Sequence, residues 1–170
     1  MKKLSAICAP WRNEQSFQSL LNSLIVALAV TLVCVIAGTL AALVAARARL
    51  RGRVWLDGLV YLPLVIPEIV IAVAMVVFFS LAHLDLSIWT IIIAHITFCL
   101  SYVIIVVGAR LGGMDRSLQE AALDLGANEW TAFRRVTLPL AAPGILSAAL
   151  LVFTTSFDDY LILRRMPSRR

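Results

Sequence analysis

Four long runs of apolar residues leave this chain few ways to fold. No charged residue occurs between Glu14 and Arg47, and the second run is interrupted only by Glu68. A helix needs about 20 apolar residues to cross the hydrocarbon core of a bilayer, where every backbone polar group must be paired within the segment. We therefore expect an all-α, polytopic membrane bundle with spans at about 20–46, 59–82, 88–108 and 136–157.

The composition argues against the main soluble classes. Hydrophobic residues make up 61% of the 170 residues and charged residues only 15%, too apolar a mixture for a small water-facing domain without large exposed patches. The net charge of +5 does not indicate nucleic acid, because Lys and Arg lie at the ends of the apolar runs. The sequence contains no GxSxG, HExxH or P-loop pattern, and its three cysteines lack CxxC spacing. We therefore expect that the protein is not an enzyme and that it binds no metal and no cofactor.

The arginines predict which ends of the spans face the cytoplasm. Short cytoplasmic loops are enriched in Lys and Arg, and the loops at 47–53 and 110–135 each carry four arginines. The connection at 83–87 has none and should lie outside. Residues 1–19 then form an external N-terminal segment, and residues 163–170 form an atypical basic tail on the same side. Both ends are basic against the rule, so we expect that a preceding and a following helix are lacking.

The polar stretch before the fourth span is expected to form two short helices. Ser117 and Glu120 have the spacing of a capping box, so a helix should begin there. It can continue to Gly126, because glycine suits the left-handed conformation that ends helices. Asn128 can cap a second helix, and Pro139 should break or bend the chain where the fourth span begins. This stretch is either a rigid cytoplasmic knob or an interfacial helix lying on lipid head groups.

The same stretch resembles the EAA loop of bacterial ABC-importer permeases. That loop reads Glu-Ala-Ala, three residues, Gly, nine residues, an aliphatic residue, one residue and Leu-Pro; the aliphatic position, usually isoleucine, is Val136 here. In that family the loop is a coupling helix that docks in a groove of the cytoplasmic ATPase. The resemblance implies ATPase-coupling roles for Glu120, Ala121, Ala122, Asp124, Gly126, Leu138 and Pro139.

Finer features look like the spermidine/putrescine branch of these permeases. The segments IPEIV, AHITFCLSYV and TTSFDDYLI are similar to parts of that branch, and the likeness covers about residues 17–162. It implies a permease domain at 20–162 with a cytoplasmic EAA loop at 110–139. About four of the usual six transmembrane helices are present, and the tail matches nothing in the family. We therefore expect a truncated or frame-shifted reading frame.

Three acidic residues are candidates for a substrate path. A charged side chain in mid-span costs about 2.5 to 3.5 kcal/mol on insertion scales, so Glu68 should face protein or water. Asp158 and Asp159 lie at the outer end of the fourth span. Carboxylates suit a polyamine, whose methylene stems aromatic walls can cover. Structural alternatives stay open: Glu68 can pair with a neighbouring helix, the Asp pair can be a solvated helix end, and His95 favours an interhelical hydrogen bond over metal ligation.

These features together predict a multi-pass permease of the bacterial inner (plasma) membrane that imports polyamines. The resemblance implies three protein partners: a cytoplasmic ABC ATPase dimer that supplies the energy, a second permease subunit, and a periplasmic or extracellular polyamine-binding protein. The prolines at 63, 67, 139 and 143 would permit bending between inward and outward states. Three alternatives stay open: a non-functional truncated remnant, a permease for another small cationic or organic solute, and a proton-coupled carrier built around Glu68 and His95.

Overall fold

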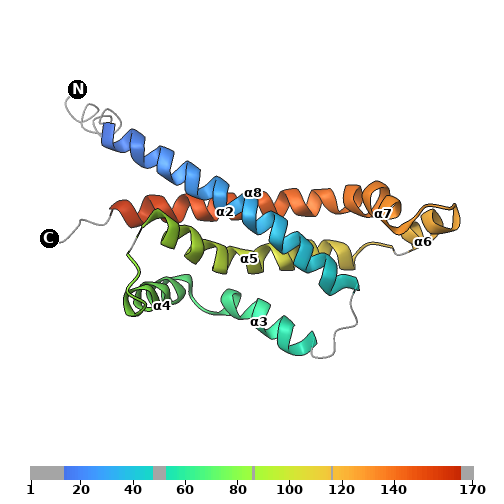
Figure 1. Cartoon of the computed structure of the whole chain (residues 1–170), viewed down its shortest axis with the longest axis horizontal. Helices are drawn as coiled ribbons and strands as arrows, with labels where there is room; N and C mark the ends of the chain where they lie inside the picture. Colours follow the sequence, from blue (N-terminus) through green and yellow to red (C-terminus); the bar gives the residue numbers. More distant parts are fainter. Residues whose placement is uncertain (1–13, 48–52, 86, 116, 166–170) are drawn as a thin grey trace, which may run out of the picture.

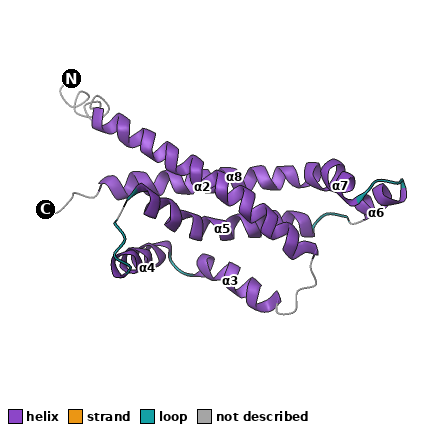
Figure 2. Cartoon of the chain, in the orientation of Figure 1, coloured by secondary structure: helices purple, strands orange, loops and turns teal. Residues whose placement is uncertain are grey.

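The computed structural model of this chain describes residues 14–47, 53–85, 87–115 and 117–165, and every element in these ranges is helical. Figure 2 shows these helices joined by short loops. In chain order they are α2 (Glu14–Arg47), α3 (Arg53–Val65), α4 (Glu68–Leu81), α5 (Ile88–Gly112), α6 (Ser117–Asp124), α7 (Glu129–Ala132), the π-helix η2 (Phe133–Thr137) and α8 (Leu138–Arg165). The expected all-α fold is confirmed.

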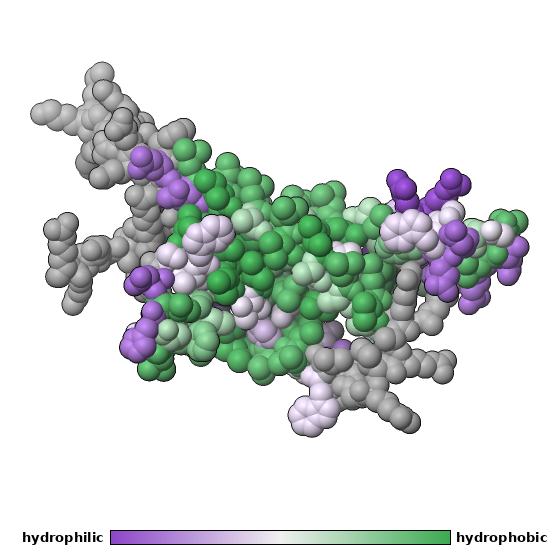
Figure 3. All heavy atoms as spheres, in the orientation of Figure 1, coloured by the Kyte–Doolittle hydropathy of each residue, from purple (hydrophilic) through white to green (hydrophobic). Residues whose placement is uncertain are grey.

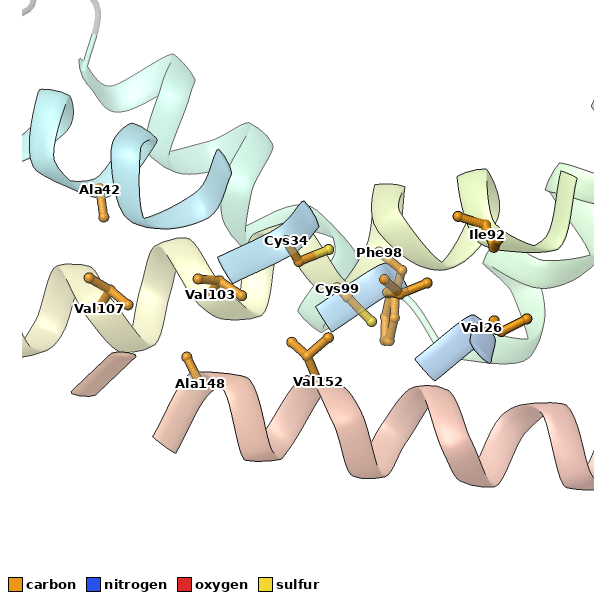
Figure 4. Close-up of a cluster of buried hydrophobic side chains, with 11 residues drawn as sticks. Val26, Cys34, Ala42, Ile92, Phe98, Cys99, Val103, Val107, Ala148 and Val152 are labelled. Atoms are coloured by element: carbon orange, nitrogen blue, oxygen red, sulfur yellow. The ribbon is translucent and has the colours of Figure 1, made fainter. Parts of the chain in front are cut away.

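The three longest helices, α2, α5 and α8, pack against one another and form the core (Figure 1). Small and β-branched side chains dominate their contact faces, as Figure 4 shows: Val26, Val30, Cys34, Ala42, Ile92, Phe98, Cys99, Val103, Val107, Ala148 and Val152. Small residues let helices approach closely. Close packing is important in a bilayer, because lipid tails are as apolar as the side chains and the hydrophobic effect does not drive helices together. α2 and α5 approach closely at Gly38, where a Cβ would lie 2.7 Å from Cβ and Cγ1 of Val103.

Three helices are long and apolar enough to cross a membrane: Leu20–Ala46, Ile88–Gly112 and Glu129–Asp158. They coincide with the first, third and fourth expected spans, although the third is longer and the fourth begins earlier. Figure 3 shows why they suit a bilayer, because apolar side chains form a continuous band between polar groups at the two ends. α2 itself begins at Glu14, within the segment expected to be external. The remainder of that segment, 1–13, and the tail residues 166–170 lie outside the described residues.

The second apolar run differs from the single span expected at 59–82. It forms two helices, Asp57–Val65 and Glu68–Leu81, bent by 104°. Pro67 explains the break, because a residue that precedes proline is driven out of the helical region, and Pro67 itself is extended with φ −54° and ψ 132°. Among the described helices, α3 and α4 contact each other and α5, but not α2 or α8. The run is therefore either a broken span or a re-entrant segment against α5.

The helix ends separate into two groups, as Figure 1 shows. The carboxyl ends of α2 and α5 lie at one end of the bundle, together with α6 and α7. The residues that follow α4, 82–85, lie at the other end, beside the start of α5. This separation matches the topology inferred from the arginines, because both arginine-rich loops adjoin the same end of the bundle.

Candidate functional site

The polar stretch between α5 and α8 begins with a carboxylate cap. The backbone N–H of Ser117 donates to Oδ1 of Asp115 at 2.9 Å, and the Ser117 side chain also hydrogen-bonds that carboxylate. The backbone bond is the main reason that the pKa of Asp115 lies below its ordinary value. α6 thus begins at Ser117 as the sequence predicts, but the cap is Asp115 and not the expected pairing of Ser117 with Glu120. An exposed aspartate two residues earlier can reach the free N–H groups of the first turn.

The expected turn at Gly126 is confirmed and is a Schellman motif. Gly126 has φ +86°, its N–H donates to the carbonyl of Leu123 at 2.9 Å, and the Ala127 N–H donates to that of Ala122 at 3.1 Å. These bonds pair the carbonyls left open at the end of α6. A side chain at position 126 would be strained, because L-residues rarely adopt a positive φ. The turn therefore fixes the direction in which the chain leaves α6.

The next helix also begins as predicted, but Pro139 does not interrupt it. Oδ1 of Asn128 accepts the Thr131 N–H at 2.8 Å and caps α7. The helix then widens into η2, in which the N–H of Leu138 bonds the carbonyl of Phe133, five residues back. Proline lacks an N–H and its ring collides with the carbonyl four residues earlier in a regular helix. The wider π turn just before Pro139 removes that conflict, so α7, η2 and α8 are continuous.

We call α6, α7 and η2 together, residues 117–137, the coupling knob. It exposes apolar side chains, with Leu125 89% and Trp130 67% exposed. Glu120, Ala121 and Asp124 are also exposed, whereas Ala122 is half-buried. Among the described elements, α6 packs on α7 and η2 but not on α2 or α5.

A cleft of about 390 Å³ separates α6 from the bundle. Its apolar wall includes Leu43 of α2, Leu111 of α5 and Leu140 of α8. Glu120 and Glu129 line its polar side. Leu138 and Pro139, the last two residues of the EAA pattern, are exposed where α8 begins. The residues of the EAA pattern are thus divided between a protruding helix and the first turn of the fourth span.

A second group of polar residues lies within the bundle. His95 Nδ1 of α5 and Ser156 Oγ of α8 are hydrogen-bonded at 2.9 Å, and Ser156 is fully buried. The interhelical hydrogen bond expected of His95 is therefore present. Glu68, exposed at the first position of α4 beside the break, interacts electrostatically with His95. The break at Pro67 thus brings an acid from the second apolar run toward the α5–α8 contact.

The other two acids belong to the carboxyl-terminal part of α8. Asp158 is exposed near the end of α8, and the side chain of Asp159 lies outside the described residues. Among the described residues, no group of three His, Cys, Asp or Glu side chains could hold a metal ion. The sequence did not identify two polar residues that form hydrogen bonds between helices, namely the buried Ser156 and Arg110. Nε of Arg110 donates to the carbonyl of Leu140 at 3.0 Å. No local sequence pattern indicates that a serine within a span, or an arginine at the end of one, makes such a contact.

Comparison with known proteins identifies the family of this chain. A model of the family described as binding-protein-dependent transport system inner membrane component matches residues 35–164. The spermidine/putrescine transport system permease protein PotC of Haemophilus influenzae is 37% identical over 152 residues, which are 89% of this chain and 59% of that protein. The protein of the same name from Escherichia coli K12 is also 37% identical, over 88% of this chain and 57% of its own length.

A third relative is similar over a shorter stretch. The putrescine transport system permease protein PotI of Escherichia coli K12 is 41% identical over 120 residues, or 67% of this chain and 43% of that protein. This chain therefore spans less than two thirds of the length of these relatives.

Proposed function

This chain belongs to the family of binding-protein-dependent transport system inner membrane components, and on this basis we propose that it is the membrane-spanning permease subunit of an ATP-driven polyamine importer. The names of the two PotC relatives and of the PotI relative refer to the transport of spermidine or putrescine, which supports this substrate class. ATP hydrolysis belongs to a partner in this proposal. The chain contributes the substrate path and the surface through which the ATPase partner drives transport.

One observation carries the proposal, namely that the helices of the coupling knob are capped and joined by a hydrogen-bonded turn while its apolar side chains are exposed. Its helices are capped by Asp115 and Asn128 and joined by the Schellman turn at Gly126. The exposed Leu125 and Trp130 fit the docking of a helix in an apolar groove, in which a few apolar side chains act as anchors. A rigid knob transmits a displacement that a flexible loop would absorb. We assign the coupling role to Glu120, Ala121, Ala122, Asp124, Gly126, Leu138 and Pro139.

The acidic residues support a cationic cargo. Glu68 lies at a helix break, where a segment that bends by 104° can open and close with little loss of backbone pairing. We propose that Glu68, Asp158 and Asp159 attract the ammonium groups of a polyamine along the path. His95 and Ser156 then hold α5 and α8 together beside this path. Replacing one acid at a time by its neutral amide tests the role of each in transport.

The same proposal implies four partners. An ABC ATPase dimer in the cytoplasm binds the coupling knob, and a second permease subunit shares the path. A periplasmic or extracellular polyamine-binding protein delivers substrate at the end of the bundle that carries residues 82–85. The bilayer covers the apolar band of Figure 3.

Site-specific photo-cross-linking tests the docking of the coupling knob. A photoreactive residue at exposed Ala121 should capture the ATPase when the chain is co-expressed with the transporter subunits of its own organism. The matched control is Ala82, an exposed alanine that caps the carboxyl end of α4, away from the coupling knob; it should capture none. Equal capture at both positions, or capture at neither while the subunits co-purify, would contradict docking through the knob.

Uptake measurements test the substrate. The co-expressed system should accumulate labelled spermidine or putrescine, and Glu68→Gln should lower this uptake while leaving the Ala121 cross-link intact. Normal uptake by Glu68→Gln would remove Glu68 from the path. Accumulation of another cation, with no polyamine uptake, would show that the substrate class is wrong.

A further inference from the structure

The coupling knob is attached to the bundle at two roots. The chain enters it from the end of α5 at Gly112 and leaves it into α8 at Leu138. Among the described elements, α6 does not pack on α2 or α5, and the cleft of about 390 Å³ lies between them. A displacement of α6 therefore reaches the bundle through the two roots and not through lateral packing.

Arg110 connects these two roots. It lies in the last turn of α5, and its Nε donates to the carbonyl of Leu140 in the first turn of α8 at 3.0 Å. The two helices also approach closely here, because a Cβ added to Gly144 would lie 2.7 Å from Cβ and 2.8 Å from Cγ of Arg110. The missing side chain at position 144 lets the Arg110 stem lie against the backbone of α8. This contact brings Nε within reach of the Leu140 carbonyl.

The usual explanation for such an arginine is different. Arginines at the cytoplasmic end of a span mark topology, and they extend toward lipid phosphates. Here the side chain runs across to the neighbouring helix and donates to its backbone. A hydrogen bond from a charged donor is stronger than a neutral one. Its acceptor lies directly after Pro139, where the coupling knob joins α8.

We infer that Arg110 is a positioning residue for energy coupling. It clamps the first turn of α8 to the last turn of α5, so that a displacement of the coupling knob moves both helices together. The inference rests on the proposed function, because it requires a partner that displaces the knob. Without the clamp, the partner still binds and hydrolyses ATP, but part of the displacement separates the two roots and does not reach the path.

Two substitutions of Arg110 separate a clamp from a simple positive charge. Arg110→Met keeps the apolar stem and removes the Nε donor, whereas Arg110→Lys keeps the charge and has a methylene at the Nε position. Each variant is assembled with the ATPase, the second permease subunit and the binding protein in lipid nanodiscs or proteoliposomes. The quantity measured is the number of polyamine molecules transported per ATP hydrolysed.

The expected result is uncoupling. Arg110→Met should assemble and hydrolyse ATP, but transport about fivefold fewer polyamines per ATP, the size expected for loss of one solvent-exposed hydrogen bond. Arg110→Lys should not restore the ratio. Wild-type coupling in Arg110→Met overturns the inference, and so does full restoration by Arg110→Lys, which would show that only the charge acts, as for a lipid phosphate anchor.

A second variant keeps the inference testable if Arg110→Met fails to assemble. Gly144→Ala keeps the guanidinium but displaces its stem, because the new Cβ would lie 2.7 Å from Cβ of Arg110. It should uncouple transport in the same way, and wild-type coupling in Gly144→Ala also overturns the inference. Failure of the proposed function is distinguishable, because the wild-type assembly would then show no ATP-dependent polyamine uptake at all.

Discussion

Replacing Gly38 by alanine tests the close packing of α2 on α5. The new Cβ would lie 2.7 Å from Cβ and Cγ1 of Val103, and ordinary contact begins at 3.4 Å, so the two helices must separate by about 0.7 Å. One of the two contacted atoms is Cβ of Val103, which rotation about χ1 cannot move, and this residue is fully buried. The strain must therefore be relieved by the helix backbones.

The expected free-energy change combines two terms of opposite sign. Overpacking a well-packed core costs about 1–3 kcal/mol, whereas alanine is better than glycine in a helix by about 0.5–1 kcal/mol. Gly108 supplies the matched control, because it is also within a helix and a Cβ there would meet nothing within 4 Å. Gly108→Ala should therefore be stabilised by the helix preference of alanine alone, with no overpacking cost. The difference between the two variants isolates the overpacking term, about 1–3 kcal/mol.

Unfolding in mixed micelles measures this difference. The purified chain is titrated with a denaturing detergent while helix content is followed by circular dichroism, and the free energies of unfolding of wild type, Gly38→Ala and Gly108→Ala are compared. We expect Gly38→Ala to be the least stable of the three and Gly108→Ala the most stable. Equal or greater stability of Gly38→Ala relative to Gly108→Ala would refute the inference that this glycine sets the distance between α2 and α5.

Three further outcomes are expected. Gly126→Ala must hold an L-residue at φ +86°, which costs about 1–2 kcal/mol, and should raise amide hydrogen exchange in α6; unchanged exchange would contradict the Schellman cap. The pKa of Asp115 is lowered by the Ser117 hydrogen bond, so its stabilisation of α6 is present above the ordinary value of 3.8 and is lost as the pH falls through the lower folded pKa. Exchange in α6 should rise over that range in wild type but show no such pH dependence in Asp115→Asn. Ser156→Ala removes the partner of His95 and should lower the free energy of unfolding by about 0.6 to 1.7 kcal/mol, and no loss in the detergent titration would show that this bond is not stabilising.

Much of the architecture was predictable because membrane insertion is governed by local composition. A run of apolar residues long enough to cross the bilayer must be helical there, whatever it packs against. The turn at Gly126 and the cap at Asn128 were predictable for a similar reason, since both depend on a few neighbouring backbone groups. The resemblance to ABC-importer permeases, inferred from the EAA pattern, is confirmed by the family match. The roles assigned to individual site residues stay predictions.

The misses share a different cause. The capping pattern of Ser117 and Glu120 competed with Asp115, whose carboxylate reaches the first turn from outside the helix. Pro139 was expected to break or bend the helix, but a π turn accommodates it. The sequence predicts one span at 59–82, yet the chain bends by 104° at the break before Pro67. Each outcome depends on which of several allowed local geometries the surrounding helices select.

The sequence by itself determined that this chain forms apolar helices, which of their ends adjoin the arginine-rich loops, and that a capped polar knob lies before the last of them. These properties depend on residues close together in the chain and on the solvent around them. Only the tertiary structure decided that Gly38 meets Val103, that His95 meets Ser156, and that Arg110 reaches across to α8. In a span that is apolar on every side, periodicity does not say which face meets which neighbour. That choice is made by the fit of small residues between helices, which no single helix contains.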